Sequence, residues 1–185
     1  MDLDYLKSLK SWTQMNPMEA KEEFRRCAIS PCYFMRNYTY VVHPVRGLVK
    51  FDLYPFQVKI IKQLQSHRFN ITRKFRQAGI TTIASLYSLW KSIFKQYQTI
   101  PILSIGDRES KEVLERIKIA YDELPSFLKP RTIKQNEHVI ELETGSKIKS
   151  IPSAKTSSRG IAGSLLIVDE AAFIETISDL WKAAY

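Results

Sequence analysis

The 185-residue sequence is poor in the side chains that most often bind metals or form disulfides, with two cysteines and three histidines. Cys27 and Cys32 stand without a second pair or clustered histidines, so a zinc site is not expected. The scattered His43, His67 and His138 are given no catalytic role. We expect the cysteines to be ordinary reduced thiols of a cytosolic protein.

Long apolar runs are also missing. The apolar stretches are short and interrupted by Lys, Ser or Gln, so no membrane-spanning helix and no membrane partner are expected. The first residues, MDLDYLKSLKSW, carry acids and no apolar signal core, which indicates an intracellular protein. With 44% hydrophobic and 25% charged residues, the composition is typical of a globular chain rather than a disordered one.

Positive charge predominates, because 28 Lys and Arg against 19 Asp and Glu give a net charge of +9. A basic surface suits a polyanionic partner such as nucleic acid. It is equally typical of a basic protein without such a partner, so charge alone does not decide.

Helical spacing alternates with short apolar runs along the chain. The predicted helices are 18–29, 56–67, 80–97 and 107–124. The predicted strands are 69–74, 99–106 and 164–170, and residues 139–151 are expected to form a hairpin that turns at Thr144–Gly145. Residues 33–53 are expected to be irregular with extended pieces. This alternation predicts an α/β fold with a mainly parallel sheet and helices on both faces.

The segment RKFRQAGITT (73–82) lies where a predicted strand meets a predicted helix. It differs from the usual phosphate-binding loop, G-x-x-x-x-G-K-[ST], because Ile80 takes the place of the lysine. Lys74 occupies the first position of that frame, from which its long side chain could reach the same phosphates. A phosphate here would meet backbone N–H groups and the helix dipole, and Thr81 would offer its hydroxyl to Mg²⁺. A strand-to-helix turn with incidental basic residues is the alternative.

The segment LLIVDEAAF (165–173) predicts a buried strand that presents acids at its carboxyl end, the edge where doubly wound sheets bind ligands. Asp169 would hold Mg²⁺, and Glu170 would polarise an attacking water. Solvated acids that end a strand are the alternative. A loop followed later by an acidic strand end is the order that a mononucleotide-binding core requires.

Gln57 is predicted on the first turn of a helix. Its amide can form two hydrogen bonds with adenine, while Tyr54 or Phe56 stacks on the ring. Aromatic core residues beside a solvent-facing glutamine fit this segment equally well.

These segments resemble the large terminase subunit of tailed bacteriophages, of the type with a T4-like packaging motor. The resemblance covers 33–57, 74–82, 156–164 and 165–173. It implies a P-loop NTPase fold of the ASCE type that is incomplete at the C-terminus, with a helical and extended region at 1–50 and a partial ATPase domain at 51–185. Large terminases continue into a C-terminal nuclease domain, which is absent here, so the chain is expected to be a portion of a longer protein or a split product.

By this resemblance Gln57 belongs to the adenine-binding motif, Asp169 with Thr81 binds Mg²⁺, and Glu170 is the catalytic carboxylate. Arg76 is implied as a second catalytic residue, an arginine finger that stabilises charge developing on the γ-phosphate. A loop arginine paired with a surface acid is the alternative. The ATP-binding residues implied are Gln57, Tyr54, Lys74, Phe75, Arg76, Gln77, Ala78, Gly79, Ile80, Thr81 and Thr82. Arg159–Gly160 also fits the family pattern.

The function so implied is ATP hydrolysis that drives double-stranded DNA into the procapsid, with ATP and Mg²⁺ as ligands. The implied partners are DNA, the portal protein, the small terminase subunit and further copies of the chain in a ring. The implied location is the host cytoplasm, transiently on the procapsid. Two alternatives stay open: a helicase-like translocase, although helicases generally keep Gly-Lys-Thr in the loop, and a DNA-binding or assembly module with an inactive nucleotide site.

Overall fold

The computed structural model describes residues 15–152, 163–175, 177–178 and 182. The described residues form two compact units. Unit 1 lies within Met1–Trp90 and Ile119–Lys129, and unit 2 lies within Lys91–Lys118 and Pro130–Tyr185. The predicted division of the chain at residue 50 stays a prediction.

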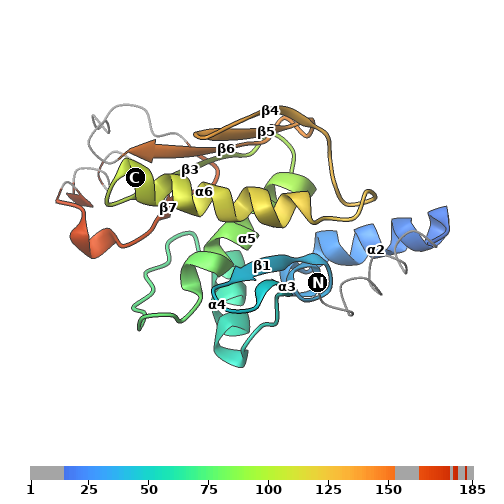
Figure 1. Cartoon of the computed structure of the whole chain (residues 1–185), viewed down its shortest axis with the longest axis horizontal. Helices are drawn as coiled ribbons and strands as arrows, with labels where there is room; N and C mark the ends of the chain where they lie inside the picture. The colour runs from blue at the N-terminus through green and yellow to red at the C-terminus, as the bar shows by residue number, and fades with distance from the viewer. Residues whose placement is uncertain (1–14, 153–162, 176, 179–181, 183–185) are drawn as a thin grey trace. The chain divides into compact units, whose positions relative to one another are not determined.

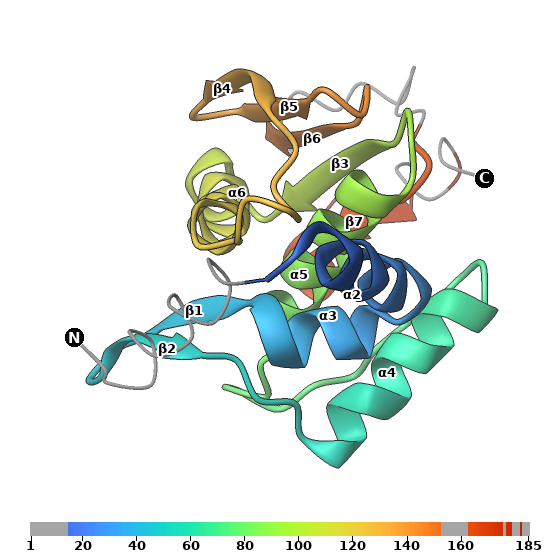
Figure 2. The same ribbon diagram turned by 90° about the vertical axis from the view of Figure 1, so that its right-hand side faces the viewer.

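Unit 1 is mainly helical (Figure 2). Its helices are α2 (Pro17–Ile29), α3 (Pro31–Tyr38), α4 (Pro55–Ser66) and the first part of α5 (Ile80–Phe94). Proline opens three of them, a position where its missing N–H costs no hydrogen bond. At α2, the Asn16 side chain accepts from the N–H of Glu19, and the Glu19 carboxylate accepts from the N–H of Asn16. The helices predicted near 18–29, 56–67 and 80–97 are therefore confirmed.

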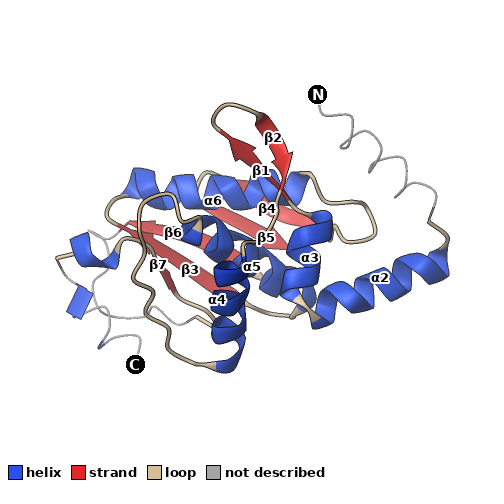
Figure 3. Cartoon of the chain, turned by 90° about the horizontal axis from the view of Figure 1, so that it is seen from below, coloured by secondary structure: helices blue, strands red, loops and turns tan. Residues whose placement is uncertain are grey.

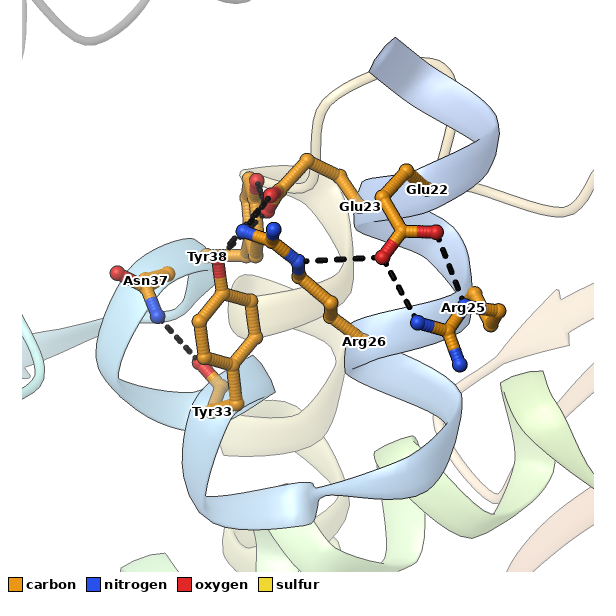
Figure 4. Close-up of polar contacts among 7 residues, drawn as sticks. All are labelled: Glu22, Glu23, Arg25, Arg26, Tyr33, Asn37 and Tyr38. Carbon is orange, nitrogen blue, oxygen red and sulfur yellow. Dashed lines mark hydrogen bonds and ion pairs between the residues drawn. The ribbon is translucent and has the colours of Figure 1, made fainter. Parts of the chain in front are cut away.

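A polar network joins α2 to α3 (Figure 4). The Glu23 carboxylate accepts hydrogen bonds from the hydroxyls of Tyr33 and Tyr38, and Arg26 donates to it at 3.1 Å. Burial, reinforced by the hydrogen bond to Glu23, raises the pKa of Tyr38 above its usual range. Tyr38 therefore stays protonated and keeps donating, which holds the two helices together.

Helix α5 is tied to α2 and α4 through two side chains. The Trp90 indole donates to the Cys27 carbonyl at 2.8 Å, and the Tyr87 hydroxyl donates to the Leu64 carbonyl at 3.3 Å. Cys27 is fully buried, and burial raises the pKa of its thiol to about 12. A thiol that stays neutral is a poor nucleophile, so Cys27 is a core residue.

Residues 33–53 are more regular than predicted. Residues 33–38 belong to α3, because Pro31 opens this helix and the Ser30 hydroxyl caps it by accepting from the N–H of Tyr33 at 3.2 Å. Strands β1 (Tyr40–His43) and β2 (Gly47–Lys50) then pair antiparallel. The prediction of an irregular segment was wrong for α3, and the expected extended pieces are this hairpin.

The strand predicted at 69–74 is absent. Residues 67–75 form no strand, and all side chains from Phe69 to Gln77 are exposed, Ile71 to 91%. A strand needs a neighbour for its backbone groups and a buried face for its apolar side chains. This segment buries no face, so its apolar residues misled the prediction.

Unit 2 contains a five-stranded sheet in the order β4-β5-β6-β3-β7. The strands are β3 (Thr99–Ser104), β4 (Thr132–Asn136), β5 (Val139–Leu142), β6 (Lys147–Pro152) and β7 (Ile167–Val168). Strand β3 runs parallel to β6 and β7, whereas β4, β5 and β6 are antiparallel (Figure 3). The fold is therefore α/β, but the sheet is mixed rather than mainly parallel.

The sheet is mixed because the predicted hairpin and β4, a strand that was not predicted, pair antiparallel. The hairpin turns at Thr144–Gly145 as predicted, with Gly145 at φ +76°. Helix α6 (Asp107–Asp122) lies alongside the sheet through its residues in unit 2 (Figure 1) and buries Val113, Leu114 and Ile117. Within the described residues, no helix combines the length and the apolar character that crossing a bilayer requires.

Candidate functional site

The loop at 74–81 brings its two ends together. The Lys74 ammonium donates a hydrogen bond to the Thr81 hydroxyl at 3.1 Å, although the two residues are seven positions apart. Thr81 lies in the first turn of α5, where backbone N–H groups have no acceptor within the helix. Lys74 was predicted to act from the first position of the loop frame. Its ammonium lies beside Thr81, the hydroxyl residue that closes the frame. The contact of Lys74 with phosphate stays a prediction.

Left-handed backbone conformations curve this loop. Gln77 has φ +61° and Gly79 has φ +71°. Turns of this kind direct successive N–H groups into a concave surface that favours anions. Among the described residues, the non-glycine residues with positive φ are Gln77, Tyr97 and Glu170, so two of them fall in the predicted motifs. The sequence did not indicate that Gln77 and Glu170 would have positive φ.

Gln57 fastens the loop to the start of α4. Its side chain is 2% exposed. The amide oxygen accepts from the N–H of Tyr54 at 3.0 Å, and the amide nitrogen donates to the carbonyl of Ala78 at 3.0 Å. A Cβ atom on Gly79 would lie 2.8 Å from the Gln57 amide nitrogen, so glycine is needed there for space as well as for its φ.

Exposed aromatic rings gather beside this loop. Tyr54 and Phe56 stack with centroids 5.9 Å apart and an interplanar angle of 7°. Phe75, within the loop, lies 6.2 Å from Phe56. Their exposed fractions are 65% for Tyr54, 38% for Phe56 and 70% for Phe75. The aromatic residues are thus a surface cluster, which removes the core alternative for this segment.

The loop is strongly positive. Arg73 and Arg76 are exposed, and neither has a hydrogen bond or an ion pair in the part of the chain that is described. The alternative of Arg76 paired with a surface acid is therefore not observed there. Ile80 and Thr82 are partly buried at the start of α5.

The acid pair follows β7 in unit 2. The Asp169 N–H donates to the Leu103 carbonyl at 2.9 Å, which continues the pairing of β7 with β3. The Glu170 N–H donates to the Asp169 carboxylate at 3.1 Å, and Glu170 is exposed with φ +54°. Both acids therefore lie at the carboxyl end of a strand, as predicted.

Strand β7 is shorter and less buried than predicted. It has two residues instead of the predicted 164–170, and both are partly exposed. It is the last strand in the sheet order, so β3 is its only described neighbour. After the acids come a 3₁₀ turn, Ala171–Phe173, and Ile174, which is buried against Leu103. The contact between Ile174 and Leu103 holds the segment that follows the acids against β3.

The residue beside Asp169 on the neighbouring strand is Ser104, buried at the end of β3. Ser104 was not predicted as a site residue. The one feature of the sequence that could have indicated it is a hydroxyl at the end of a buried apolar strand. Within the described residues, no group of three or more His, Cys, Asp and Glu side chains is placed to hold a metal ion. Arg159–Gly160 lies outside the described residues.

The structure therefore brings the predicted residues together in two sets. Gln57, Lys74, Ala78, Gly79 and Thr81 form one connected group in unit 1. Asp169 and Glu170 form the other in unit 2. Their assignment to one nucleotide site stays a prediction.

Comparison with known proteins supports the fold. No protein-family model matches this chain. A crystal structure of the HK97 bacteriophage large terminase aligns with 85% of this chain at a TM-score of 0.64 and 16% sequence identity. The chain corresponds to 36% of that protein. A likeness at this identity shows a terminase-like fold and leaves activity to be argued from the residues.

Proposed function

We propose that this chain is the ATPase portion of a viral large terminase, which couples ATP hydrolysis to the movement of double-stranded DNA into a procapsid. Two observations support the proposal: the terminase-like fold and the loop at 74–81. The contact between Lys74 and Thr81 carries it, because in this proposal Lys74 takes the role of the lysine that Ile80 replaces.

In this proposal each loop group has one task. Lys74 and Arg76 neutralise the phosphates, and Arg76 stabilises the charge that develops on the transferred group. The left-handed turn around Ala78 adds backbone N–H groups to the same anion. Tyr54 and Phe75 contact the base.

The chemistry of the remaining groups fits a magnesium ion. The Thr81 hydroxyl and the Asp169 carboxylate are hard oxygen donors, the kind that Mg²⁺ prefers, and they would hold it. When bound, Mg²⁺ neutralises phosphate charge. Glu170 orients the attacking water and accepts its proton, and its exposed position leaves it accessible to solvent.

Steady-state ATP turnover and ATP affinity test this proposal. In Glu170→Gln, turnover should fall about 10²–10⁴-fold, the usual contribution of a general base, with ATP affinity unchanged. In Lys74→Ala, ATP affinity itself should fall, because a phosphate contact is removed. Undiminished turnover in Glu170→Gln would sink the catalytic assignment.

Matched variants separate these effects from general changes in charge. Glu175→Gln removes an exposed acid near Glu170, and Lys59→Ala removes an exposed lysine of α4. Both should behave as the unmodified chain. If the unmodified chain binds no ATP but binds DNA in a salt-sensitive way, the inactive-module alternative replaces the proposal. ATP-driven strand unwinding without packaging would instead favour the helicase-like alternative.

We further propose double-stranded DNA, a portal protein, a small terminase subunit and other copies of the chain in a ring as partners, on the procapsid in the host cytoplasm. The net charge of +9 supports a polyanionic partner. A surface suited to DNA is the outer side of β4–β6, where Lys134, Lys147 and Lys149 line a shallow hollow. Lys147 pairs with Glu141 at 2.8 Å, whereas Lys134 and Lys149 have no ion pair among the described residues.

A further inference from the structure

The amide of Gln57 is fully engaged by the protein. Its oxygen accepts from the N–H of Tyr54, and its nitrogen donates to the carbonyl of Ala78. The amide cannot be turned around, because Tyr54 offers only a donor there and Ala78 only an acceptor. With 2% of its side chain exposed, Gln57 does not present the donor and acceptor together to a ligand.

This arrangement joins two segments that are 21 positions apart in the sequence. One is the start of α4, and the other is the residue between Gln77 and Gly79, both of which have positive φ. Gly79 also lets the amide nitrogen approach, since a Cβ there would lie 2.8 Å away. Gln57 thus contacts the part of the loop whose curvature directs the backbone N–H groups.

We infer that Gln57 is a positioning residue that holds the phosphate-binding loop in its curved conformation, and that nucleotide bases are recognised here by stacking on aromatic rings without hydrogen bonds from Gln57. The inference rests on the proposed nucleotide site.

Stacking has a specific consequence for the choice of substrate. Phe75, Phe56 and Tyr54 are exposed rings, and the nearby amide of Gln57 is engaged by Tyr54 and Ala78. Every base has an aromatic face, so stacking tolerates all of them. The site is therefore expected to accept nucleoside triphosphates as a class, with ATP and GTP binding within about threefold of each other.

Calorimetric titration of ATP, GTP and inorganic tripolyphosphate, each with Mg²⁺, tests the inference. Gln57→Met removes both hydrogen bonds at similar length. It should weaken all three ligands by a common factor, about tenfold for a loss equivalent to one good hydrogen bond. The ratio of ATP to GTP affinity should not change. Selective loss of ATP binding, with tripolyphosphate unaffected, would overturn the inference and leave the proposed function standing.

Four further variants test the interpretation. Gln57→Glu keeps the acceptor for Tyr54 and removes the donor to Ala78, so it should reproduce the common loss even if Gln57→Met folds poorly. Gln63→Met, at an exposed position of the same helix, is the control and should bind all three ligands normally. Phe75→Ala should weaken ATP and GTP by about tenfold and leave tripolyphosphate unchanged, whereas Phe75→Trp should restore both.

Amide hydrogen exchange in the absence of ligand gives an independent readout. Exchange over residues 77–82 should be faster in Gln57→Met than in the unmodified chain, and unchanged in Gln63→Met. Unchanged exchange in Gln57→Met would show that Gln57 does not hold the loop. If the unmodified chain bound none of the three ligands, the proposed function would fail, and the exchange data would still decide whether Gln57 positions the loop.

Discussion

The loop at 74–81 and the acid pair at 169–170 are held in place by different kinds of contact. In the loop, side chains make the decisive bonds, from Gln57 to Ala78 and from Lys74 to Thr81. At the acid pair, the bond to the neighbouring strand is between backbone groups, from Asp169 to Leu103. The loop therefore depends on the identity of its own and distant side chains, whereas the acids depend on the sheet.

This difference separates function from stability. An acid whose backbone makes the bond to the sheet can lose its charge without loss of structure. A loop fastened by buried side chains cannot be changed without a change of shape. Substitutions that neutralise the acid pair should therefore affect chemistry alone, and substitutions in the loop should affect both chemistry and stability.

The largest effect is expected for Asp169→Asn. Replacing the charged Mg²⁺ ligand should lower ATP turnover by about a hundredfold or more. The urea midpoint should stay within experimental error, because the backbone bond to Leu103 is kept. Asp52→Asn, at an exposed position in unit 1, is the control and should leave turnover unchanged. A marked loss of stability in Asp169→Asn would contradict the distinction between the two regions.

A smaller effect, on stability, is expected at the glycines. Gly47 and Gly79 both have positive φ, but a Cβ on Gly47 would meet nothing within 4 Å. Gly47→Ala should cost about 1–2 kcal/mol for the left-handed backbone alone. Gly79→Ala should cost about 2–4 kcal/mol, because it also displaces the Gln57 amide from a buried hydrogen bond.

A double-mutant cycle tests the cause of this difference. In a Gln57→Ala background, Gly79→Ala should cost no more than Gly47→Ala does, since nothing is left to displace. Urea unfolding of the four chains measures the coupling. Additive costs would show that Gln57 and Gly79 act independently, and the account of a loop held by side chains would then be wrong.

The sequence predicted the local part of each region. The positions of Lys74 and Thr81 in a known frame, followed by helical spacing, were enough to predict a loop that leads into a helix at Ile80. Likewise, an apolar run before Asp169 was enough to predict acids at a strand end. These features depend on neighbours in the sequence, and periodicity detects such neighbours.

The parts that the sequence did not predict depend on distant contacts. The hydrogen bond from the Gln57 amide nitrogen to the carbonyl of Ala78, 21 positions away, was not predicted, and the contact of Gln57 with adenine stays a prediction. Residues 69–74 have strand-like composition, yet all of their side chains are exposed and they form no strand. Strand β7 has two residues, and the shortness of this strand was not indicated by its apolar run. Strand β4 was missed because four of its five residues are exposed, so it has no alternating apolar pattern.

A modest effect is expected on DNA binding. It should distinguish the lysines of unit 2, which are proposed to contact DNA, from Lys74 of unit 1, which is proposed to contact ATP. Lys134→Ala and Lys149→Ala should each weaken DNA binding uniformly across sequences and reduce the salt slope by about one. ATP affinity should not change in either variant. Lys74→Ala should show the converse, with normal DNA binding. Filter binding over a range of salt concentrations measures the affinity for DNA and for ATP. If each variant weakened DNA and ATP binding equally, the two units would not bind different polyanions.

The smallest effect concerns pH and again differs between the units. In unit 1, hydrogen bonds from Arg25 lower the pKa of Glu22 from its usual 4.5 to about 2 (Figure 4). Because the folded pKa is the lower one, this contribution to stability is present above pH 4.5 and lost as the pH falls toward 2. In unit 2, a hydrogen bond to Asp107 raises the pKa of Lys111 above 10.5, so its contribution is present below pH 10.5 and lost as the pH rises further.

Glu22→Gln should therefore flatten only the acid limb of the urea midpoint against pH, and Lys111→Gln only the alkaline limb. Both groups are partly exposed, so the two effects should be small and should shrink further at high salt. Backbone amide signals of α2 and of residues 107–118 of α6, followed by NMR during urea titration, assign each change to its unit. An acid limb that is equally steep in Glu22→Gln would show that the ion pairs of α2 do not contribute to the stability of unit 1.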